Sequence, residues 1–120
     1  LAFEILDTGG AWVSEHPWGV PSFKNHFVPR NRIQMGLSAG SIIVEAGLKS
    51  GSMTQARLCR EQGRPLFAVV PYDEENSLGL NCEGTCSIVE DPNYGATPIK
   101  SKHDYSRVLE ILLNERRLLE

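Results

Sequence analysis

Cysteine is scarce in this sequence, and the few cysteines form no pattern typical of a cross-linked or metal-bound scaffold. Three cysteines occur among 120 residues, and an odd number gives no complete disulfide framework. Cys82 and Cys86 lie four residues apart, but a structural metal needs three or four ligands, and no histidine or third cysteine lies close in sequence. We therefore expect no metal, no cofactor, and the reduced thiols of a cytoplasmic protein.

Long apolar runs are also missing. No stretch approaches the roughly 20 residues that cross a bilayer, and the charged and apolar segments of a secretory signal are absent. The hydrophobic fraction of 41% and the charged fraction of 22% are ordinary for a soluble globular protein. These features predict a single cytoplasmic domain with one core and no membrane partner.

An excess of positive charge is missing too, since the net charge is -3. Its distribution is uneven, however. Residues 1–60 carry six basic side chains against four acidic ones, whereas residues 61–120 carry six against eleven. Local fields decide binding more than the total does. An anionic ligand is therefore expected on the first half, although ordinary surface scatter would give similar counts.

Short apolar runs alternate with helical patterns along the chain. The expected helices are residues 1–8, 29–37, 52–62, 80–90 and a last one after 101, and the expected strands are 11–14, 41–46, 65–70 and 97–100. The β-branched run at 41–46 is typical of a strand covered on both faces. Ser101 and Asp104 fit a capping box before the last helix. The alternation predicts an α/β fold with a mostly parallel sheet, whose ligands collect beyond the carboxyl ends of its strands.

The first candidate site lies between an expected strand and an expected helix, at residues 49–54. Gly51 allows the backbone a tight path close to a ligand. The free amides after it, with the dipole of the helix, favour an anion, and the hydroxyls of Ser50, Ser52 and Thr54 would add donors. The segment is not a Walker A loop. An alternative is that Ser50 or Ser52 simply caps the helix.

The second candidate site has two arginines that flank an asparagine at a helix start: Arg30, Asn31 and Arg32. Side chains two positions apart on a helix diverge by about 200°, so the arginines would not serve one small ligand together. One could hold a phosphate while the other pairs with a carboxylate such as Glu45. Phe27 could stack on a base or pack in the core, which is the commoner fate of a lone phenylalanine.

The third candidate site, Ser14, Glu15 and His16, suggests a hydrolase at first. Adjacent side chains on an extended chain point to opposite faces, so Ser14 and His16 could meet but Glu15 would not complete a triad. The G-x-S-x-G nucleophile elbow is absent. We therefore predict no catalytic residue and no enzyme activity.

These segments, in this order and spacing, resemble the DprA/Smf DNA-processing family. The matching residues are Ser14-Glu15-His16-Pro17, Phe27 with Pro29 to Ile33, Gly36-Leu37-Ser38, Val44-Glu45-Ala46, Ser50 to Thr54, Glu61, Gly63, Arg64, Ala68-Val69, Ser77, Gly79 and Asn81. The resemblance covers about residues 9–81. Each motif alone is weak, but the ordered set is specific.

The resemblance implies a Rossmann-like three-layer fold with a mostly parallel sheet, in which residues 1–120 form a single, partial domain without the family's first strands. It implies non-catalytic binding of single-stranded DNA in DNA processing, recombination and uptake, transfer of the strand to a RecA-type recombinase, and a homodimer. Stacking and phosphate contacts would make binding sequence-tolerant and salt-sensitive. The implied DNA-binding residues are Lys24, Phe27, Arg30, Asn31, Arg32, Lys49, Ser50, Gly51, Ser52 and Thr54.

Two other functions stay open. One is a nucleotide-binding or nucleotide-hydrolysing protein of the wider Rossmann-like group, related to the lysine-decarboxylase-like phosphoribohydrolases. Those enzymes carry a PGG-x-GT-x-x-E signature, and residues 49–55 lack its double glycine and its glutamate. The other is a regulatory or protein-interaction module that uses the acidic second half of the chain.

Overall fold

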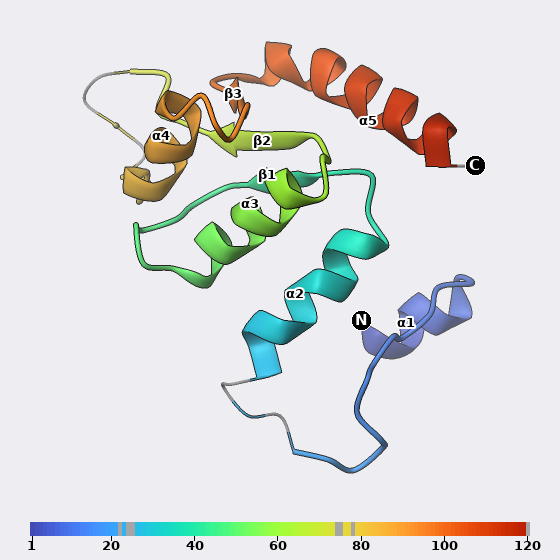
Figure 1. The fold of residues 1–120 in the computed structure, drawn as a ribbon. Coiled ribbons are helices and arrows are strands. Elements are labelled where there is room, and N and C mark those ends of the chain that lie inside the picture. Colours follow the sequence, from blue (N-terminus) through green and yellow to red (C-terminus); the bar gives the residue numbers. More distant parts are fainter. Residues whose placement is uncertain (22, 24–25, 74–75, 78, 120) are drawn as a thin grey trace.

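The computed structural model describes residues 1–21, 23, 26–73, 76–77 and 79–119. In chain order its elements are α1 (Ala2–Asp7), α2 (Phe27–Gly36), β1 (Ser41–Ile43), α3 (Gly51–Glu61), β2 (Leu66–Val69), α4 (Glu83–Glu90), β3 (Thr97–Ile99), the 3-10 helix η2 (Lys102–Asp104) and α5 (Tyr105–Leu119). Figure 1 shows α2 leading from the amino-terminal segment toward the sheet. Within these described ranges, no helix combines the length and the apolar character that a bilayer crossing requires.

The three strands form one parallel sheet in the order β1-β2-β3. In its register Ser41 pairs with Leu66, and Phe67 pairs with Thr97. Parallel neighbours need a crossover connection, and α3 and α4 supply the two crossovers. The predicted α/β fold with a parallel sheet is confirmed.

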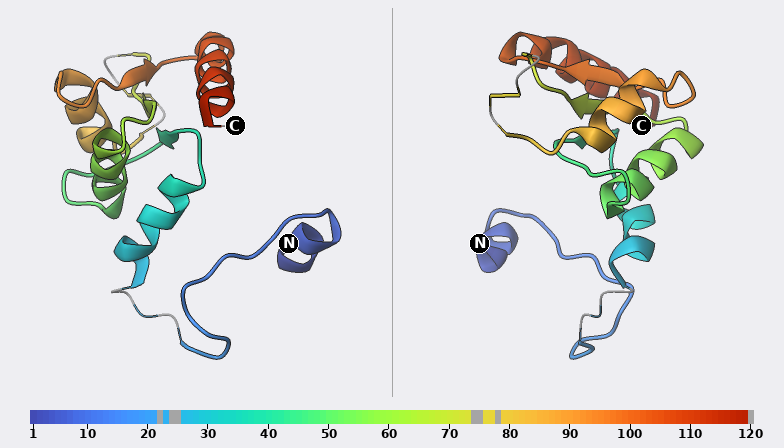
Figure 2. Two further views of the ribbon diagram at one scale, coloured as in Figure 1. Left: turned by 45° about the vertical axis from the view of Figure 1, so that its right-hand side comes forward. Right: turned by 90° about the vertical axis from the view of Figure 1, so that its left-hand side faces the viewer.

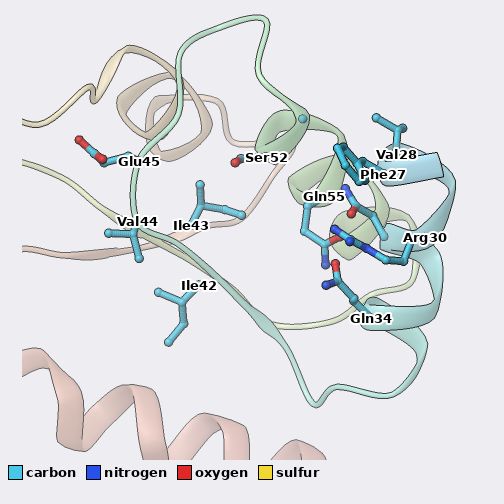
Figure 3. Close-up of a pocket in the computed structure, with 12 residues that line it drawn as sticks. Phe27, Val28, Arg30, Gln34, Ile42, Ile43, Val44, Glu45, Ser52 and Gln55 are labelled. Atoms are coloured by element: carbon cyan, nitrogen blue, oxygen red, sulfur yellow. The ribbon is translucent and has the colours of Figure 1, made fainter. Parts of the chain in front are cut away.

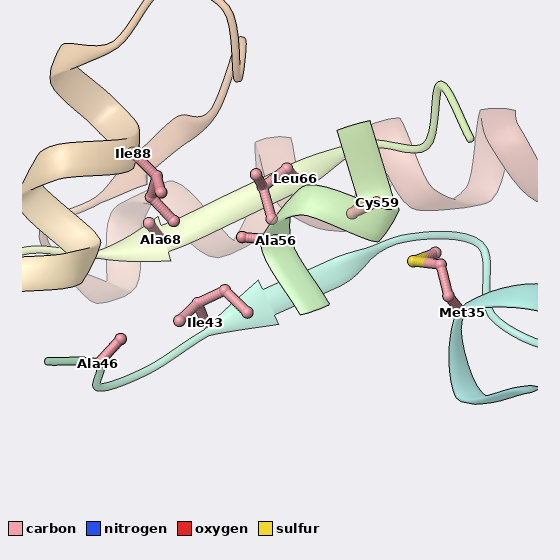
Figure 4. Close-up of a cluster of buried hydrophobic side chains, with 8 residues drawn as sticks. All are labelled: Met35, Ile43, Ala46, Ala56, Cys59, Leu66, Ala68 and Ile88. Carbon is pink, nitrogen blue, oxygen red and sulfur yellow. The ribbon is translucent and has the colours of Figure 1, made fainter. Parts of the chain in front are cut away.

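Alternate residues of β2 face two different helical layers. Leu66 and Ala68 belong to a buried cluster with side chains of α3 and α4, which Figure 4 shows. Phe67 instead packs with Ile99 and with Val108 of α5, because successive side chains of a strand point to opposite faces. Figure 2 shows α5 on one side of the sheet and α3 with α4 on the other. The Rossmann-like three-layer arrangement is therefore confirmed.

The cover of β1 differs from the prediction. The strand ends at Ile43 rather than at residue 46, and Ile42 is 47% exposed and Val44 57% exposed. β1 lies at the edge of the described sheet, whereas the α5 layer packs on β2 and β3. The interpretation of a strand covered on both faces is wrong here. β-branched residues favour a strand, but they do not determine how many layers cover it.

The strand expected at residues 11–14 does not form. The segment is irregular, and its apolar side chains stay in contact with solvent, with Trp12 42% exposed and Val13 64% exposed. A short apolar run becomes a stable strand when a neighbouring strand pairs with it. Both views of Figure 2 place this segment away from the sheet, so it has no such neighbour there.

Local sequence signals set several helix boundaries correctly. Gly9 and Gly63 lie just past α1 and α3 with φ of +83° and +64°, a conformation that glycine adopts without strain. Ser101 and Asp104 form the expected capping box at η2. These boundaries depend on neighbouring residues alone, which is why the sequence predicts them.

Candidate functional site

A hollow of about 470 Å³ lies between α2, the carboxyl end of β1 and the first turn of α3. We call it the helix-tip hollow. Figure 3 shows Arg30, Gln34 and Gln55 gathered at one side of it and Glu45 at the other. The predicted site residues that line it are Phe27, Arg30, Asn31, Gly51 and Ser52. The first and second candidate sites, about 20 residues apart in sequence, therefore form one site in the fold.

The first turn of α3 contributes backbone donors to this hollow. Ser50 is the N-cap residue, with φ -78° and ψ 158°, but its side chain makes no capping hydrogen bond. The alternative that Ser50 merely caps the helix is therefore wrong. The first amides of a helix have no acceptor within it, and Gly51 and Ser52 are the first-turn residues of α3 that line the hollow. Their amides and the positive end of the dipole favour an anion.

Gly51 is not required by the fold. Its backbone is helical, and a Cβ built at this position would meet no atom within 4 Å. The tight backbone path that the sequence suggested is therefore unnecessary for the chain itself. What the glycine does is leave space in front of the helix start, where a ligand can approach the backbone closely.

The two arginines have different partners, as their divergence on a helix predicts. Arg32 forms an ion pair with Glu15. Arg30 lies over the ring of Phe27, with 5.5 Å from Cζ to the ring centroid, and within the described ranges it pairs with no carboxylate. The carboxylate suggested for such a pair, Glu45, instead accepts a hydrogen bond from the Asn81 amide at 3.0 Å.

Phe27 is 46% exposed, so the expectation that it packs in the core is wrong. Its ring is the first side chain of α2 and lines the helix-tip hollow. Lys49 is exposed, and Ser50, Thr54 and Arg32 are likewise not among the residues that line the hollow. Lys24 lies outside the described residues.

Gln55 was missed by the sequence reasoning. Its Nε2 donates to Ser41 Oγ at 3.1 Å, which joins α3 to β1. Its Oε1 is buried without a partner among the residues described, as is Ser50 Oγ, and a buried polar atom left unpaired costs about 1–3 kcal/mol. The signal was present in the sequence, because Gln55 lies three residues after Ser52 and so shares its helix face. A ligand that donates to Gln55 Oε1 would remove part of that cost.

The third candidate site forms no catalytic relay. Ser14 Oγ accepts a hydrogen bond from the His16 amide at 3.0 Å and donates to the His16 carbonyl at 3.1 Å. Its partner is thus the backbone of His16 rather than the imidazole ring. Glu15 pairs with Arg32, and the His16 ring stacks on His26 with 4.3 Å between centroids. The three side chains therefore serve local structure and the contact with α2.

Comparison with known proteins shows which family the chain is similar to. The model of the family described as DNA recombination-mediator protein A matches residues 1–109. Protein Smf of Escherichia coli is 52% identical over 69 residues, which are 58% of this chain and 18% of that protein. DNA processing protein DprA of Bacillus subtilis is 51% identical over 57 residues, which are 48% of this chain and 19% of that protein.

A solved structure of DNA processing protein A from Helicobacter pylori, described by its single-stranded DNA binding mode, matches with a TM-score of 0.64 and 32% identity. The match covers 80% of this chain and 41% of that one. The chain thus spans about a fifth of the length of these curated relatives. Because the family model covers most of its residues, the chain belongs to the DNA recombination-mediator protein A family.

Proposed function

We propose that this chain binds single-stranded DNA through the helix-tip hollow and catalyses no reaction. Its role would be in DNA processing, recombination and uptake, and its location would be the cytoplasm. The observation that carries the proposal is the position of Arg30. Its guanidinium has no carboxylate partner in the described ranges and lines the same hollow as the first turn of α3. One arginine and the backbone amides of Gly51 and Ser52 make the proposed seat for a phosphate of the strand.

Physical magnitudes support phosphate binding at this place. The helix dipole contributes about 0.3–1 kcal/mol to an anion at the helix start, and a charge-assisted hydrogen bond contributes about 1.5–3 kcal/mol. Phe27 lies half exposed beside this seat, where its ring can stack on a base. Stacking of this kind tolerates any sequence, because every base has a π face.

The test is a fluorescence anisotropy titration with a labelled oligo-dT at low salt. Arg30→Ala should weaken binding roughly tenfold or more, because a charged hydrogen bond is lost. It should also make the affinity less sensitive to salt, by about 0.7 in the slope for one phosphate on a single strand. Arg57→Ala is the matched control, since Arg57 is exposed on α3 and does not line the hollow.

A panel of mononucleotides, run beside the oligomer, separates this function from nucleotide binding. Tight oligomer binding with none to mononucleotides supports the proposal. Equal affinity of Arg30→Ala and the parent chain for oligo-dT contradicts it, and tight binding of a mononucleotide alone favours the phosphoribohydrolase-like alternative.

The proposal includes two partners that the sequence resemblance implies: a second copy of the chain and a RecA-type recombinase that receives the strand. Light scattering across a concentration series measures the first, and a shift toward twice the monomer mass is expected. Exchange of a labelled strand from this protein to a recombinase filament measures the second. A monomer at all concentrations, or no transfer, would remove the corresponding partner.

A further inference from the structure

A small polar junction lies behind one wall of the helix-tip hollow and joins three elements. Gln55 Nε2, on α3, donates to Ser41 Oγ at 3.1 Å and to Met35 Sδ at 3.7 Å. Ser41 Oγ, at the start of β1, donates to the same sulfur at 3.4 Å. Met35, in the last turn of α2, is fully buried, and Ser41 is 9% exposed. Of these three side chains only that of Gln55 lines the hollow, so it connects the hollow to the buried contacts of α2 and β1.

The side-chain amide of Gln55 has partners at one end only. Its Nε2 donates to both other members of the junction, whereas its Oε1 is buried and accepts no hydrogen bond from the residues described. A buried acceptor without a donor lowers stability. A phosphate of a DNA strand cannot supply that donor, because a phosphodiester is ionised at neutral pH and carries no proton on its oxygens. The phosphate seat and the present orientation of the amide are therefore mismatched.

A half-turn of this amide removes the mismatch. The oxygen and the NH₂ group of an amide are nearly equal in size, so the turned side chain occupies the same space. Oε1 then accepts a hydrogen bond from the hydroxyl of Ser41, and it is a better acceptor than a thioether sulfur. Nε2 is released toward the hollow, on the side where Figure 3 shows Arg30. Without an anion this orientation is unfavourable, because Arg30 also offers only donors.

We propose that Gln55 binds the phosphate directly: when a strand enters the helix-tip hollow, the amide turns and its Nε2 donates to a phosphate oxygen beside Arg30. The inference rests on the proposed function and adds a neutral donor to its phosphate seat. Both ends of the amide have partners in this bound state, since Oε1 accepts from Ser41. Met35 Sδ loses its two hydrogen bonds, so occupation of the hollow changes a contact at the buried end of α2.

Two substitutions separate direct binding from a purely structural role of Gln55. Gln55→Glu keeps the size of the side chain and can still accept from Ser41, so a structural role alone predicts little change. Direct contact predicts that oligo-dT binding, measured by fluorescence anisotropy, weakens by about tenfold or more, because a like charge replaces a donor. Gln62→Glu is the matched control. It makes the same charge change at the exposed C-cap of α3 and should leave the affinity nearly unchanged.

Gln55→Leu removes the donor without adding a charge. It should weaken oligo-dT binding by about tenfold, the lower end for a hydrogen bond to a charged group. Because the lost donor is neutral, the salt dependence of the affinity should stay as in the parent chain, whereas Arg30→Ala should reduce the slope. Circular dichroism confirms that each variant is folded before its affinity is compared.

The turn of the amide also has a spectroscopic signature in the parent chain. The sequence has two methionines, Met35 and Met53, so labelled methionine methyls give two NMR signals, which Met53→Leu assigns. Met35 does not line the hollow. Its methyl signal should nevertheless shift as oligo-dT is added, with the same saturation curve as the anisotropy, because its sulfur loses two hydrogen bonds. Saturation without such a shift would show that the amide does not turn.

The outcomes distinguish this contact from the proposed function. If Arg30→Ala weakens binding while Gln55→Glu and Gln55→Leu bind as the parent chain does, the phosphate seat stands and the direct contact of Gln55 is wrong. If the parent chain binds no oligo-dT, the proposed function fails and the contact fails with it.

Discussion

The amino-terminal segment, residues 1–21, and the sheet unit that begins at β1 use similar side chains in opposite ways. None of residues 1–21 is buried, and Trp18 is 90% exposed. In the sheet unit Phe67 is 1% exposed and Ile88 is fully buried. An apolar residue becomes core when a second surface covers it. The difference therefore lies in the partners that the fold brings, not in the composition of the two regions.

The candidate site lies between α2 and the sheet unit. The sheet unit supplies the rigid part, because packing of α3 on β1 and β2 fixes the helix start that lines the hollow. The amino-terminal segment does not line this hollow, and its contacts with α2 and the N-cap of α2 include the Glu15–Arg32 ion pair and the stack of His16 on His26. We infer that the helix start is well ordered in the free protein.

The largest contrast should come from removing one aromatic ring in each region. Phe67→Ala leaves a cavity between β2 and α5 and should lower the free energy of unfolding by about 3–5 kcal/mol. Trp18→Ala removes an exposed ring and should change it by no more than about 0.5 kcal/mol. Urea denaturation followed by circular dichroism measures both. A loss of several kcal/mol for Trp18→Ala would show that the segment is part of the cooperative core.

The next contrast uses two glycines. A Cβ on Gly84, at the start of α4, would lie 2.7 Å from the Ala46 carbonyl oxygen and 2.9 Å from the Ala46 Cβ. Gly84→Ala should therefore lower the free energy of unfolding by about 1–3 kcal/mol. Gly36 ends α2, and a Cβ there would meet nothing within 4 Å. Gly36→Ala should raise stability by up to about 1 kcal/mol through helix propensity.

Thermal unfolding of Gly84→Ala and Gly36→Ala compares how tightly the chain packs around α4 with how tightly it packs around α2. If Gly36→Ala is as harmful as Gly84→Ala, then α2 packs against a surface as tightly as α4 does. The border between the two regions would then have to be moved toward the amino terminus.

Features decided by nearby residues were predictable, whereas those decided by distant partners were not. The capping box of Ser101 and Asp104 and the glycine after α3 need a few consecutive residues. The runs at 11–14 and 66–69 are both short and apolar, yet only the second finds parallel neighbours, and pairing partners cannot be identified from the run itself. The exposed face of β1 was missed for the same reason.

The candidate site divides in the same manner. The anion-favouring start of α3 and the divergence of Arg30 and Arg32 follow from helix geometry, and the structure agrees with the latter. The partner of Arg32 lies 17 residues away in a segment without regular structure, so its choice of Glu15 over Glu45 could not be derived. The hydrogen bond between Gln55 and Ser41 joins α3 to β1, so it could be identified only from the folded structure.

A smaller effect on stability is expected from Asp104, a carboxylate in the sheet unit that is not buried. Asp104 is partly exposed to solvent, and its Oδ2 accepts hydrogen bonds from the backbone amides of Lys100 and Ser101, both at 2.9 Å. These bonds lower the pKa of its carboxyl below the usual range near 3.9. A lowered pKa in the folded state stabilises the protein above the usual range, and this stabilisation is lost as the pH falls through the folded pKa.

Asp104→Asn should therefore reduce stability at neutral pH, and the difference from the parent chain should shrink as the pH falls below about 4. Urea denaturation at a series of pH values measures it. A difference that stays constant with pH would mean that the carboxylate charge contributes nothing, and that the asparagine differs in its hydrogen bonds alone.

The smallest global effect is expected from the ion pair that connects the amino-terminal segment to α2. Arg32 and Glu15 are both largely exposed, with side chains at 59% and 44%, and such pairs contribute about 0–1 kcal/mol. Glu15→Gln should thus leave the unfolding transition nearly unchanged. It should still free residues 10–21 from α2, so their amides should exchange faster in hydrogen-exchange mass spectrometry, and high salt should produce the same change in the parent chain.

The control for this last prediction is the pair in the sheet unit, Arg64 and Glu115, whose side chains are 15% and 23% exposed. Breaking it with Glu115→Gln leaves Arg64 half-buried without its partner, which costs more than breaking a surface pair. This variant should shift the unfolding transition and leave exchange at residues 10–21 unaltered. If the two variants instead had the same profile, the amino-terminal segment and the sheet unit would unfold together.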